Sequence, residues 1–318
     1  MSITLVRYAT DDRAQWGVAT ADGVAPMPTD YVSTADVLAD VVKHARSLAA
    51  DAGGERVPLR ALRLLPPTPG ARVVCQGANY RSHMAESGMD PARAFNMLFT
   101  KSTASLSGPD DEIVRPPHVR LLDYEVELGV VVGKPVTGPV TVTEDNLADY
   151  VGAFVLANDV SARDVQLPQG QWYKGKSYRT FCPVGPYLVV PDPDEVARWR
   201  DLRLTLSVNG SVRQDGLAGD MVFGPAATLT ELSGLEQLDV GDLLLTGTPG
   251  GCALQPPPTL VQRFAGLLPD QKRWALFTSS QLRSDAYLKP GDQVVAAIRT
   301  GDGALDLGTQ HNTIRDGS

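Results

Sequence analysis

The sequence predicts an α+β fold that is mainly β, with a small N-terminal α/β unit at residues 1–65 and a larger β-rich domain at residues 66–318. Beyond residue 70, short runs of β-branched and aliphatic residues follow one another, separated by Gly, Pro and Asn turns. Few helical segments lie between these runs, which argues against regular βαβ alternation. The proline-marked stretch LLPPTPG at 64–70 is a stiff connector and gives the boundary between the two units.

The N-terminal unit begins with three strand-like runs, SITLVRYAT, QWGVAT and GVAPM. A helical segment, STADVLADVVKHARSLAADAGG, follows them. Its apolar residues recur at helical spacing, and two glycines stop the pattern. These residues are Val37, Leu38, Val41, Val42, Ala45 and Leu48, followed by Gly53 and Gly54.

The second unit contains β-type runs at RVVCQG, YEVELGVVVG, YVGAFVLAND, GPYLVV, LRLTLSVNG, DLLLTG and QVVAAIR. We find no internal repeat in it. The segment at about 255–287 differs from these runs, because it carries some helical periodicity and lies between two turn motifs. We therefore interpret it as an insertion.

Composition narrows the class of protein. A hydrophobic content of 43% and a charged content of 21% are typical of a globular chain with a real core. The net charge of −8 is spread along the chain without a basic stripe, so no nucleic-acid partner is expected. The opening MSITLVRYATDDR lacks the pattern of a signal peptide, and no apolar run reaches the length of a membrane span. We expect a cytoplasmic protein that does not bind membranes.

The three cysteines are widely spaced and form no CxxC pair: Cys75, Cys182 and Cys252. An odd number of isolated cysteines fits reduced thiols. It fits neither a disulfide framework nor a zinc site.

The run DYEVELGVVVGK at 123–134 alternates like a strand, but one of its faces is acidic. The apolar face comprises Val126, Leu128, Val130 and Val132, and the opposite face begins with Asp123, Glu125 and Glu127. Residues two apart on a strand point the same way and lie about 6.6 Å apart. Glu125 and Glu127 can therefore converge on one point, and a divalent cation would remove their repulsion. All-oxygen ligation favours Mg²⁺, Mn²⁺ or Ca²⁺ over zinc, and the alternative is an exposed strand face whose glutamates meet water.

Asp159, in VGAFVLANDVSARDVQ, is a candidate third ligand. It follows the apolar run 151–157, where a buried strand reaches a polar rim. Taken alone, Asp159 is better explained as a turn or helix-cap residue. Together with Glu125 and Glu127, it favours a metal site.

GQWYKGKS at 170–177 satisfies the P-loop pattern G-x4-G-K-[ST]. A working P-loop also needs a hydrophobic strand before it and a helix after it. Here a polar, proline-containing stretch precedes the motif, and Pro183 and Pro186 follow it. The match does not predict a nucleotide site, so Lys176 needs another explanation.

Several motifs together resemble the fumarylacetoacetate hydrolase (FAH) family. They are GANYRSHMAE, MLFTKSTASLSGP, YEVELGVVVGK, ANDVSARDVQ, GKSYRTFCPVGP, LSVNGSVRQDG and LLLTGTPGG, in this order. The resemblance covers about 70–254 and resumes at LKPGDQVVAAI (288–298), and it is closest to the acylpyruvase and 2-hydroxyhepta-2,4-diene-1,7-dioate isomerase-like branch. It implies an FAH-type mixed β-sandwich roll for the second unit, a small oxo-acid substrate and a homodimer.

The resemblance also assigns roles to the acidic residues and to Lys176. It places a metal triad on Glu125, Glu127 and Asp159, holding Mg²⁺ or Mn²⁺, with Ca²⁺ as a further option. Asp123 would orient a ligand or a bound water. Lys176 matches the family's active-site lysine, whose ammonium would stabilise negative charge that develops in the transition state. A lone lysine of this kind is otherwise a solvated surface charge.

His83 and Glu86, in NYRSHMAESG, are three residues apart and would share a face of a helix. A carboxylate beside an imidazole fixes its tautomer and raises its basicity, which suits a general base that activates water. Family members that hydrolyse or decarboxylate carry such a pair on a mobile lid, and SGMDP would be its hinge. The alternative is an exposed ion pair on a surface helix.

Five further residues are candidates for substrate binding. Arg163 and Gln166 match family positions that support or contact the substrate, and Thr248 matches a threonine that contacts its carboxylate. Tyr80 and Arg81 are candidates at the mouth of the pocket. Arg163 could instead form a structural salt bridge, for example with Asp164. Thr248 could belong to a tight connection between strands.

Two features depart from the family pattern. Arg179 stands where the family commonly has an aspartate, so it reverses a charge and would suit a substrate with an extra acidic group. The insertion at 255–287 replaces a short loop, and it would roof the pocket or extend a dimer contact.

Three hypotheses about function follow. The first is a divalent-metal-dependent hydrolase that cleaves a C–C bond in a β-diketo acid such as an acylpyruvate. The second keeps the site but changes the reaction to 2-oxo acid tautomerisation, decarboxylation or isomerisation of a 2-hydroxy-diene-dioate. The third is a binding protein without activity, which the joint presence of Glu125, Glu127, Asp159 and Lys176 disfavours.

Overall fold

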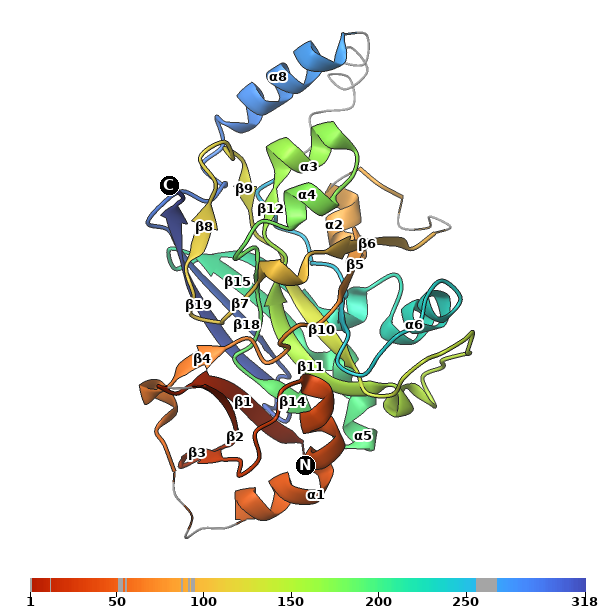
Figure 1. Ribbon diagram of the computed structural model, residues 1–318. Coiled ribbons are helices and arrows are strands. Elements are labelled where there is room, and N and C mark those ends of the chain that lie inside the picture. The colour runs from red at the N-terminus through yellow and green to blue at the C-terminus, as the bar shows by residue number, and fades with distance from the viewer. Residues whose placement is uncertain are drawn as a thin grey trace.

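The structure, a computed structural model, describes residues 2–11, 13–50, 54, 56–86, 88–90, 92, 95–255 and 268–318. Two β-sheets form the body of the molecule, with helices around them (Figure 1). The fold is mainly β with mixed sheets, as the sequence predicts. Within the described ranges, no helix is long and apolar enough to cross a membrane.

The larger sheet has ten strands in the order β3-β2-β1-β14-β11-β10-β17-β5-β6, with β4 paired to β1. All neighbours in it are antiparallel except β17 and β5. Its strands are β1 (Ile3–Ala9), β2 (Ala14–Thr20), β3 (Gly23–Pro26), β4 (Arg63–Leu65), β5 (Val73–Gly77), β6 (Met97–Lys101), β10 (Val126–Val132), β11 (Val151–Asn158), β14 (Leu188–Val190) and β17 (Leu243–Leu245).

The N-terminal strands share this sheet with the rest of the chain. β1 pairs with β14, with Ile3 opposite Val190 and Leu5 opposite Leu188. Residues 1–65 therefore pack directly onto the larger unit. The boundary at residue 65 stays a prediction.

The second sheet has five strands in the order β16-β15-β18-β19-β8. They are β8 (Ile113–Arg115), β15 (Arg203–Val208), β16 (Ser211–Leu217), β18 (Gln293–Arg299) and β19 (Asp306–Asp316). Two short pairs complete the strands: β7 (Leu106–Ser107) with β13 (Cys182–Pro183), and β9 (Leu122–Asp123) with β12 (Ser161–Ala162).

Within the described residues, the helices other than α1 and α8 are short. The helices are α1 (Thr34–Ala50), α2 (Arg81–Glu86), α3 (Arg163–Gln169), α4 (Tyr173–Lys176), α5 (Pro193–Val196), α6 (Pro225–Ser233) and α8 (Asp270–Gln281). The 3₁₀ turns are η1 (Leu59–Ala61), η2 (Thr103–Ser105), η3 (Leu147–Asp149), η4 (Ala197–Asp201) and η5 (Ala218–Asp220). α2, α3 and α4 gather at one end of the sheets, and α8 extends away from the body beyond them (Figure 1).

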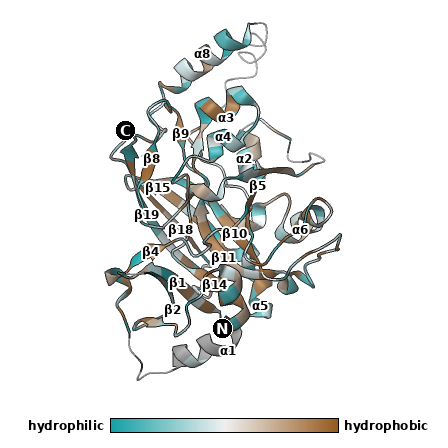
Figure 2. Cartoon of the chain, in the orientation of Figure 1, coloured by the Kyte–Doolittle hydropathy of each residue, from teal (hydrophilic) through white to brown (hydrophobic). Residues whose placement is uncertain are grey.

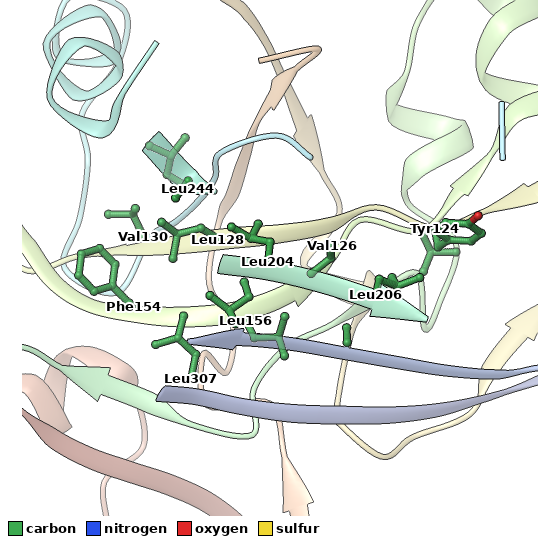
Figure 3. Packing of buried hydrophobic residues seen from close by; sticks show 14 of the residues in the cluster. Tyr124, Val126, Leu128, Val130, Phe154, Leu156, Leu204, Leu206, Leu244 and Leu307 are labelled. Carbon is green, nitrogen blue, oxygen red and sulfur yellow. The ribbon is translucent and has the colours of Figure 1, made fainter. Parts of the chain in front are cut away.

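The main hydrophobic core lies between the two sheets. Val126, Leu128 and Val130 of β10 pack there with Leu204 and Leu206 of β15 (Figure 3). The predicted apolar face of this strand is therefore confirmed. Hydrophobic residues concentrate on these central strands (Figure 2).

The other face of the larger sheet is covered by α1. Val37 and Val41 are fully buried there, in a cluster that also contains Val131 from the opposite face of β10. Ser33 and Asp36 bond each other's backbone N–H groups and begin the helix. The predicted helix is confirmed, and the predicted stop at Gly53 lies outside the described residues.

The predicted strand at 123–134 is wrong in one detail, because it is interrupted. β9 ends at Asp123 and β10 begins at Val126. At the break, Glu125 N donates to Asn158 Oδ1 at 3.0 Å, and Val126 N donates to Gln214 Oε1 at 3.0 Å. Side-chain amides thus replace ladder partners at the position where the acidic residues lie.

Candidate active site

Three carboxylates converge beside the larger sheet. Glu125 lies in the break before β10, Glu127 lies on β10, and Asp159 follows β11. One oxygen from each lies within 4.8 Å of the others. Their exposed fractions are 6%, 1% and 0%, so the group is buried. β10 pairs with β11 in a register that sets Val126 opposite Asn158, which brings Asp159 to the two glutamates.

Lys176 holds two of these carboxylates together. Its Nζ donates to Glu125 Oε2 at 2.6 Å and to Asp159 Oδ2 at 2.5 Å. The side chain is only 2% exposed. Lys176 therefore lies inside the acidic cluster, and the P-loop interpretation of its motif is excluded.

A second lysine, Lys101 at the end of β6, binds the other oxygen of Asp159. Its Nζ also donates to Phe181 O at 2.8 Å and to Val160 O at 3.3 Å. These three acceptors use all three protons of the ammonium. Lys101 was not predicted as a site residue, although it ends an apolar strand with a charge, just as Asp159 does.

Arg163, at the start of α3, carries the third positive charge. Its Nε donates to Asp123 Oδ2 at 2.8 Å, and its guanidinium also binds Glu125 and, at 2.9 Å, Gln166 Oε1. The suggested salt bridge with Asp164 is wrong, because Asp164 Oδ2 accepts the backbone N–H of Arg120 at 2.8 Å. Asp123 thus acts on Glu125 through Arg163.

The charges act strongly on the pKa values. Burial would raise the pKa of Glu125, but Lys176 and Arg163 outweigh it and lower that pKa to about 2. Burial, together with the charges of Asp159 and Glu125, raises the pKa of Glu127 well above its ordinary value. Burial would lower the pKa of Lys176, but Asp159 and Glu125 raise it overall, so this ammonium stays charged.

The three carboxylates fit a hard divalent cation. The donors are all oxygens, as Mg²⁺ and Mn²⁺ prefer. Among the described residues, Glu127 Oε2 accepts the backbone N–H of Gly247 at 2.8 Å and no other hydrogen bond, and burial beside Asp159 and Glu125 raises the pKa of this carboxylate. A cation held by Glu125, Glu127 and Asp159 would supply positive charge there.

α2 brings His83 to this cluster. Burial lowers the pKa of His83, the charge of Glu125 raises it and the charge of Arg163 lowers it, with a net downward shift. His83 Nδ1 is buried and has no hydrogen-bond partner within the part of the chain that the structure describes. Glu86 Oε2 instead accepts the N–H of Gly251 at 2.8 Å. The expectation that Glu86 fixes the imidazole is therefore not met in this arrangement, and the net pKa shift is downward.

The structure places the two expected pocket-mouth residues differently. Tyr80 is fully buried in the main core, so its predicted place at the mouth is wrong. Arg81 is exposed, and its guanidinium donates to Asp220 O at 3.3 Å. Arg81 therefore ties α2 to η5.

The turn after β17 forms hydrogen bonds with residues of the site. Thr248 Oγ1 donates to Val126 O at 2.8 Å and accepts from Gln214 Nε2 at 2.8 Å. Its hydroxyl proton is thus in use, and a substrate carboxylate would have to displace Val126 O to receive it. The backbone N–H groups of Ala253 and Leu254 bind Asp123 at 2.8 and 3.1 Å.

Gln166 is also part of the framework, because its carbonyl oxygen holds Arg163. Gly175 of α4 lies against it, and a Cβ on this glycine would come within 2.7 Å of Gln166 Cβ. Only glycine lets α4 approach α3 this closely. This contact positions Lys176.

Of the two departures from the family pattern, Arg179 is exposed. In the insertion, residues 256–267 lie outside the described residues, and α8 is tied back at Gln281, whose Nε2 donates to Gln255 O at 2.8 Å. Any role as a roof of the pocket stays a prediction.

The fold and this buried centre of carboxylates and lysines define a β-sheet enzyme that acts on small molecules. The chain belongs to the fumarylacetoacetate hydrolase family: residues 72–315 match the family model described as fumarylacetoacetate (FAA) hydrolase C-terminal. The family predicted from the motifs is thereby confirmed.

Relatives in this family carry several activities in their names. The chain is 42% identical over 196 residues to 2,4-didehydro-3-deoxy-L-rhamnonate hydrolase of Sphingomonas sp. (strain SKA58), covering 61% of this chain and 67% of the relative. It is 39% identical over 203 residues to the mitochondrial oxaloacetate tautomerase FAHD2A of Homo sapiens, covering 63% of each. The match thus spans less than two thirds of the tautomerase's length.

Solved structures match along almost the whole chain. A fumarylacetoacetate hydrolase from Exiguobacterium antarcticum superposes with a TM-score of 0.74 at 30% identity, over 99% of this chain and all of the other. A 2-hydroxyhepta-2,4-diene-1,7-dioate isomerase from Mycobacterium marinum gives 0.69 at 26% identity, over 99% and 98%. Both support the FAH-type fold expected from the motifs.

Proposed function

We propose that the protein is a divalent-metal-dependent hydrolase that cleaves a C–C bond in an acylpyruvate-type β-diketo acid. The observation that carries this proposal is the buried cluster of Glu125, Glu127 and Asp159 with the Lys176 ammonium between two of them. Mg²⁺ or Mn²⁺ bound there would polarise the oxygens of the substrate's oxo-acid end and orient it.

The charge balance of the cluster favours an anionic substrate. Four buried carboxylates, those of Asp123, Glu125, Glu127 and Asp159, face the three cations of Lys101, Arg163 and Lys176. With all seven ionised, the net charge is −1, and a divalent cation changes it to +1. A carboxylate-bearing substrate would then neutralise the buried site.

His83 supplies the general base in this proposal. Its lowered pKa leaves the imidazole neutral near pH 7, so a ring nitrogen can take a proton from water. The water oxygen attacks the distal carbonyl carbon, and the bond from that carbon to the neighbouring CH₂ breaks. The electron pair of that bond forms the enolate of pyruvate, the protonated His83 returns its proton to the CH₂ carbon, and the distal half leaves as a carboxylic acid.

Lys176 stabilises the negative charge that develops on the enolate oxygen. Its ammonium stays protonated, and Glu125 and Asp159 hold it inside the site where that charge appears. Arg163 and Asp123 keep Glu125 in place.

A second candidate is tautomerisation of a 2-oxo acid at the same site. The bond from the Gly251 N–H to Glu86 favours it, because His83 then lacks the carboxylate partner that would assist water activation. Tautomerisation needs only a proton shuttle and gives one product. Hydrolysis gives two.

The first experiment strips the protein with a chelator and follows the enol absorbance of acetylpyruvate before and after Mn²⁺ or Mg²⁺ is added. We expect metal-dependent loss of absorbance, with pyruvate and acetate identified by mass. Glu127→Ala should lose the reaction, whereas Glu231→Ala on the exposed side of α6 should retain it.

Loss of absorbance without a split product would replace hydrolysis with the second candidate. Full turnover by Glu127→Ala would contradict both. The expected homodimer and the cytoplasmic location stay predictions, and light scattering of the purified protein measures the first of them.

A further inference from the structure

Both lysines of the site have an aromatic residue beside them on the same face of their element. On β6, Phe99 lies two residues before Lys101, so the two side chains point the same way. At the start of α4, Trp172 lies four residues before Lys176, and Lys176 N donates to Trp172 O at 3.1 Å. A strand and a helix thus present the same arrangement.

The two aromatic rings meet. Phe99 and Trp172 pack edge to face, with ring centroids 5.1 Å apart. Lys176 Nζ lies 5.5 Å from the centre of the Phe99 ring. The aromatic pair therefore borders directly on the ammonium that binds Glu125 and Asp159.

Gly77, at the end of β5, makes room for the indole. A Cβ at this position would lie 2.4 Å from Trp172 Cζ3 and 2.9 Å from Met97 Sδ. Met97 pairs with Gly77 across β5 and β6. Met97, Phe99 and Trp172 thus form one apolar surface, which we call the aromatic wall.

The aromatic wall leads from the buried cluster toward solvent. Lys101 and Lys176 are buried, whereas the three wall residues are half-buried. Tyr173, next to Trp172, is 52% exposed. A molecule whose acidic end occupies the cluster can therefore lay its other end against these side chains.

We propose that the aromatic wall binds the distal group of the substrate and selects an aromatic or aliphatic hydrocarbon group there. This inference rests on the proposed function, which places the oxo-acid end at the carboxylates and lysines. A hydrocarbon group on this apolar surface gains by leaving water, whereas a carboxylate loses hydration without a partner on the wall.

The proposal opposes one expectation from the sequence. Arg179 in place of an aspartate predicts a substrate with an extra acidic group. Two relatives are also named for dicarboxylates, oxaloacetate and a diene-dioate. Arg179 is exposed, while the wall borders the buried ammonium. The affinities of suitable ligands distinguish an acidic distal group from a hydrocarbon one.

The experiment uses calorimetry to measure how tightly three 2-oxo acids bind to the Mn²⁺-loaded protein. None of the three can be hydrolysed. The ligands are 2-oxopentanoate, 2-oxo-4-phenylbutanoate and 2-oxoadipate, whose distal groups are methyl, phenyl and carboxylate. We expect the phenyl ligand to bind about tenfold more tightly than 2-oxopentanoate, and 2-oxoadipate to bind most weakly.

Trp172→Ala should remove most of the preference for phenyl and change the affinity for 2-oxopentanoate by about twofold or less. Trp172→Phe should retain most of it, since a flat ring remains. Leu235→Ala, at an exposed apolar residue after α6, is the control and should behave as wild type. Circular dichroism verifies that each variant is folded.

Tightest binding of 2-oxoadipate, or an unchanged phenyl preference in Trp172→Ala, would overturn the aromatic wall and leave the proposed function standing. Binding of none of the three ligands to protein that holds Mn²⁺ would overturn the proposed function, and the inference with it.

Discussion

Lys101 and Lys176 bind the same carboxylate, yet their surroundings give them different tasks. Lys101 donates its three ammonium protons to Asp159, Val160 O and Phe181 O. Lys176 makes two short bonds, both to carboxylates that the proposed cation would share, and a longer one to Asp159 O at 3.4 Å. Lys101 is therefore a fixed counter-ion, while Lys176 can exchange partners when substrate and metal are bound.

Lys101→Met should destabilise the protein. The change leaves one oxygen of a fully buried carboxylate without its partner, and breaking a buried ion pair in this way costs about 3–5 kcal/mol. Urea unfolding measures the free energy of unfolding. Lys174→Met, at an exposed position of α4, should change it by about 0.5 kcal/mol or less. Equal effects of the two substitutions would show that Lys101 is not a needed counter-ion.

His83 should set the acid limb of the pH–rate profile. Burial lowers its pKa below the ordinary 6.5. The unprotonated imidazole is the active form, so kcat/KM should rise with pH through a value below 6.5 and then level off. His83→Gln should lose about 10²-fold or more of the activity and also lose this limb. An unchanged limb in His83→Gln would assign the titration to another group.

Among the elements, α4 is held in place by a glycine. A Cβ on Gly175 would meet the backbone N and Cα of Gln166 at 2.8 Å, so α3 and α4 would have to separate. We expect Gly175→Ala to lower kcat by about 10²-fold, because a displacement of about 1 Å at Lys176 is enough for such a loss. Steady-state kinetics with the Mn²⁺-loaded protein measures it.

Gly138→Ala is the matched control for that variant. A Cβ at this position meets nothing within 4 Å, and the backbone there is not left-handed. Its kcat should equal that of the wild type. A kcat within twofold of wild type in Gly175→Ala would show that α4 tolerates the shift.

Elements also show how far the sequence predicts this molecule. Alternation and helical spacing predicted β10, β11, β15 and α1, because local pattern decides which face is buried. The break at Tyr124–Glu125 was not predictable in this way. It depends on the amides of Asn158 and Gln214, which are distant in the sequence.

The site also contains some features that local sequence predicts and others that depend on distant residues. Glu125, Glu127 and Asp159 were predictable because a carboxylate on or after an apolar strand needs an explanation. The partner of Glu86 was not, since the Gly251 N–H comes from a turn about 165 residues away. The spacing of the two residues suggested His83 as the partner of Glu86, because both lie on the same short helix.

At the scale of the whole molecule, the site depends on the complete sheet. Two of the three carboxylates lie at β10 and the third follows β11, the strands at the centre of the ten-stranded sheet. β1 and β14 extend the same sheet to the N-terminal strands. Unfolding therefore separates the ligands, which couples metal binding to global stability.

Mn²⁺ or Mg²⁺ should therefore stabilise the whole protein against heat. A ligand that binds only the folded state adds about 2.7 kcal/mol at a concentration 100 times its Kd. For a chain of this size, that energy raises Tm by about 4 °C. Differential scanning fluorimetry with chelator-treated protein measures the shift. Glu127→Gln should abolish it, because the variant removes a ligand charge from the cluster, while Glu231→Gln on the surface should keep it. An equal shift in both variants would mean that the cation binds elsewhere, and the carboxylates beside β10 would then need another partner for their charge.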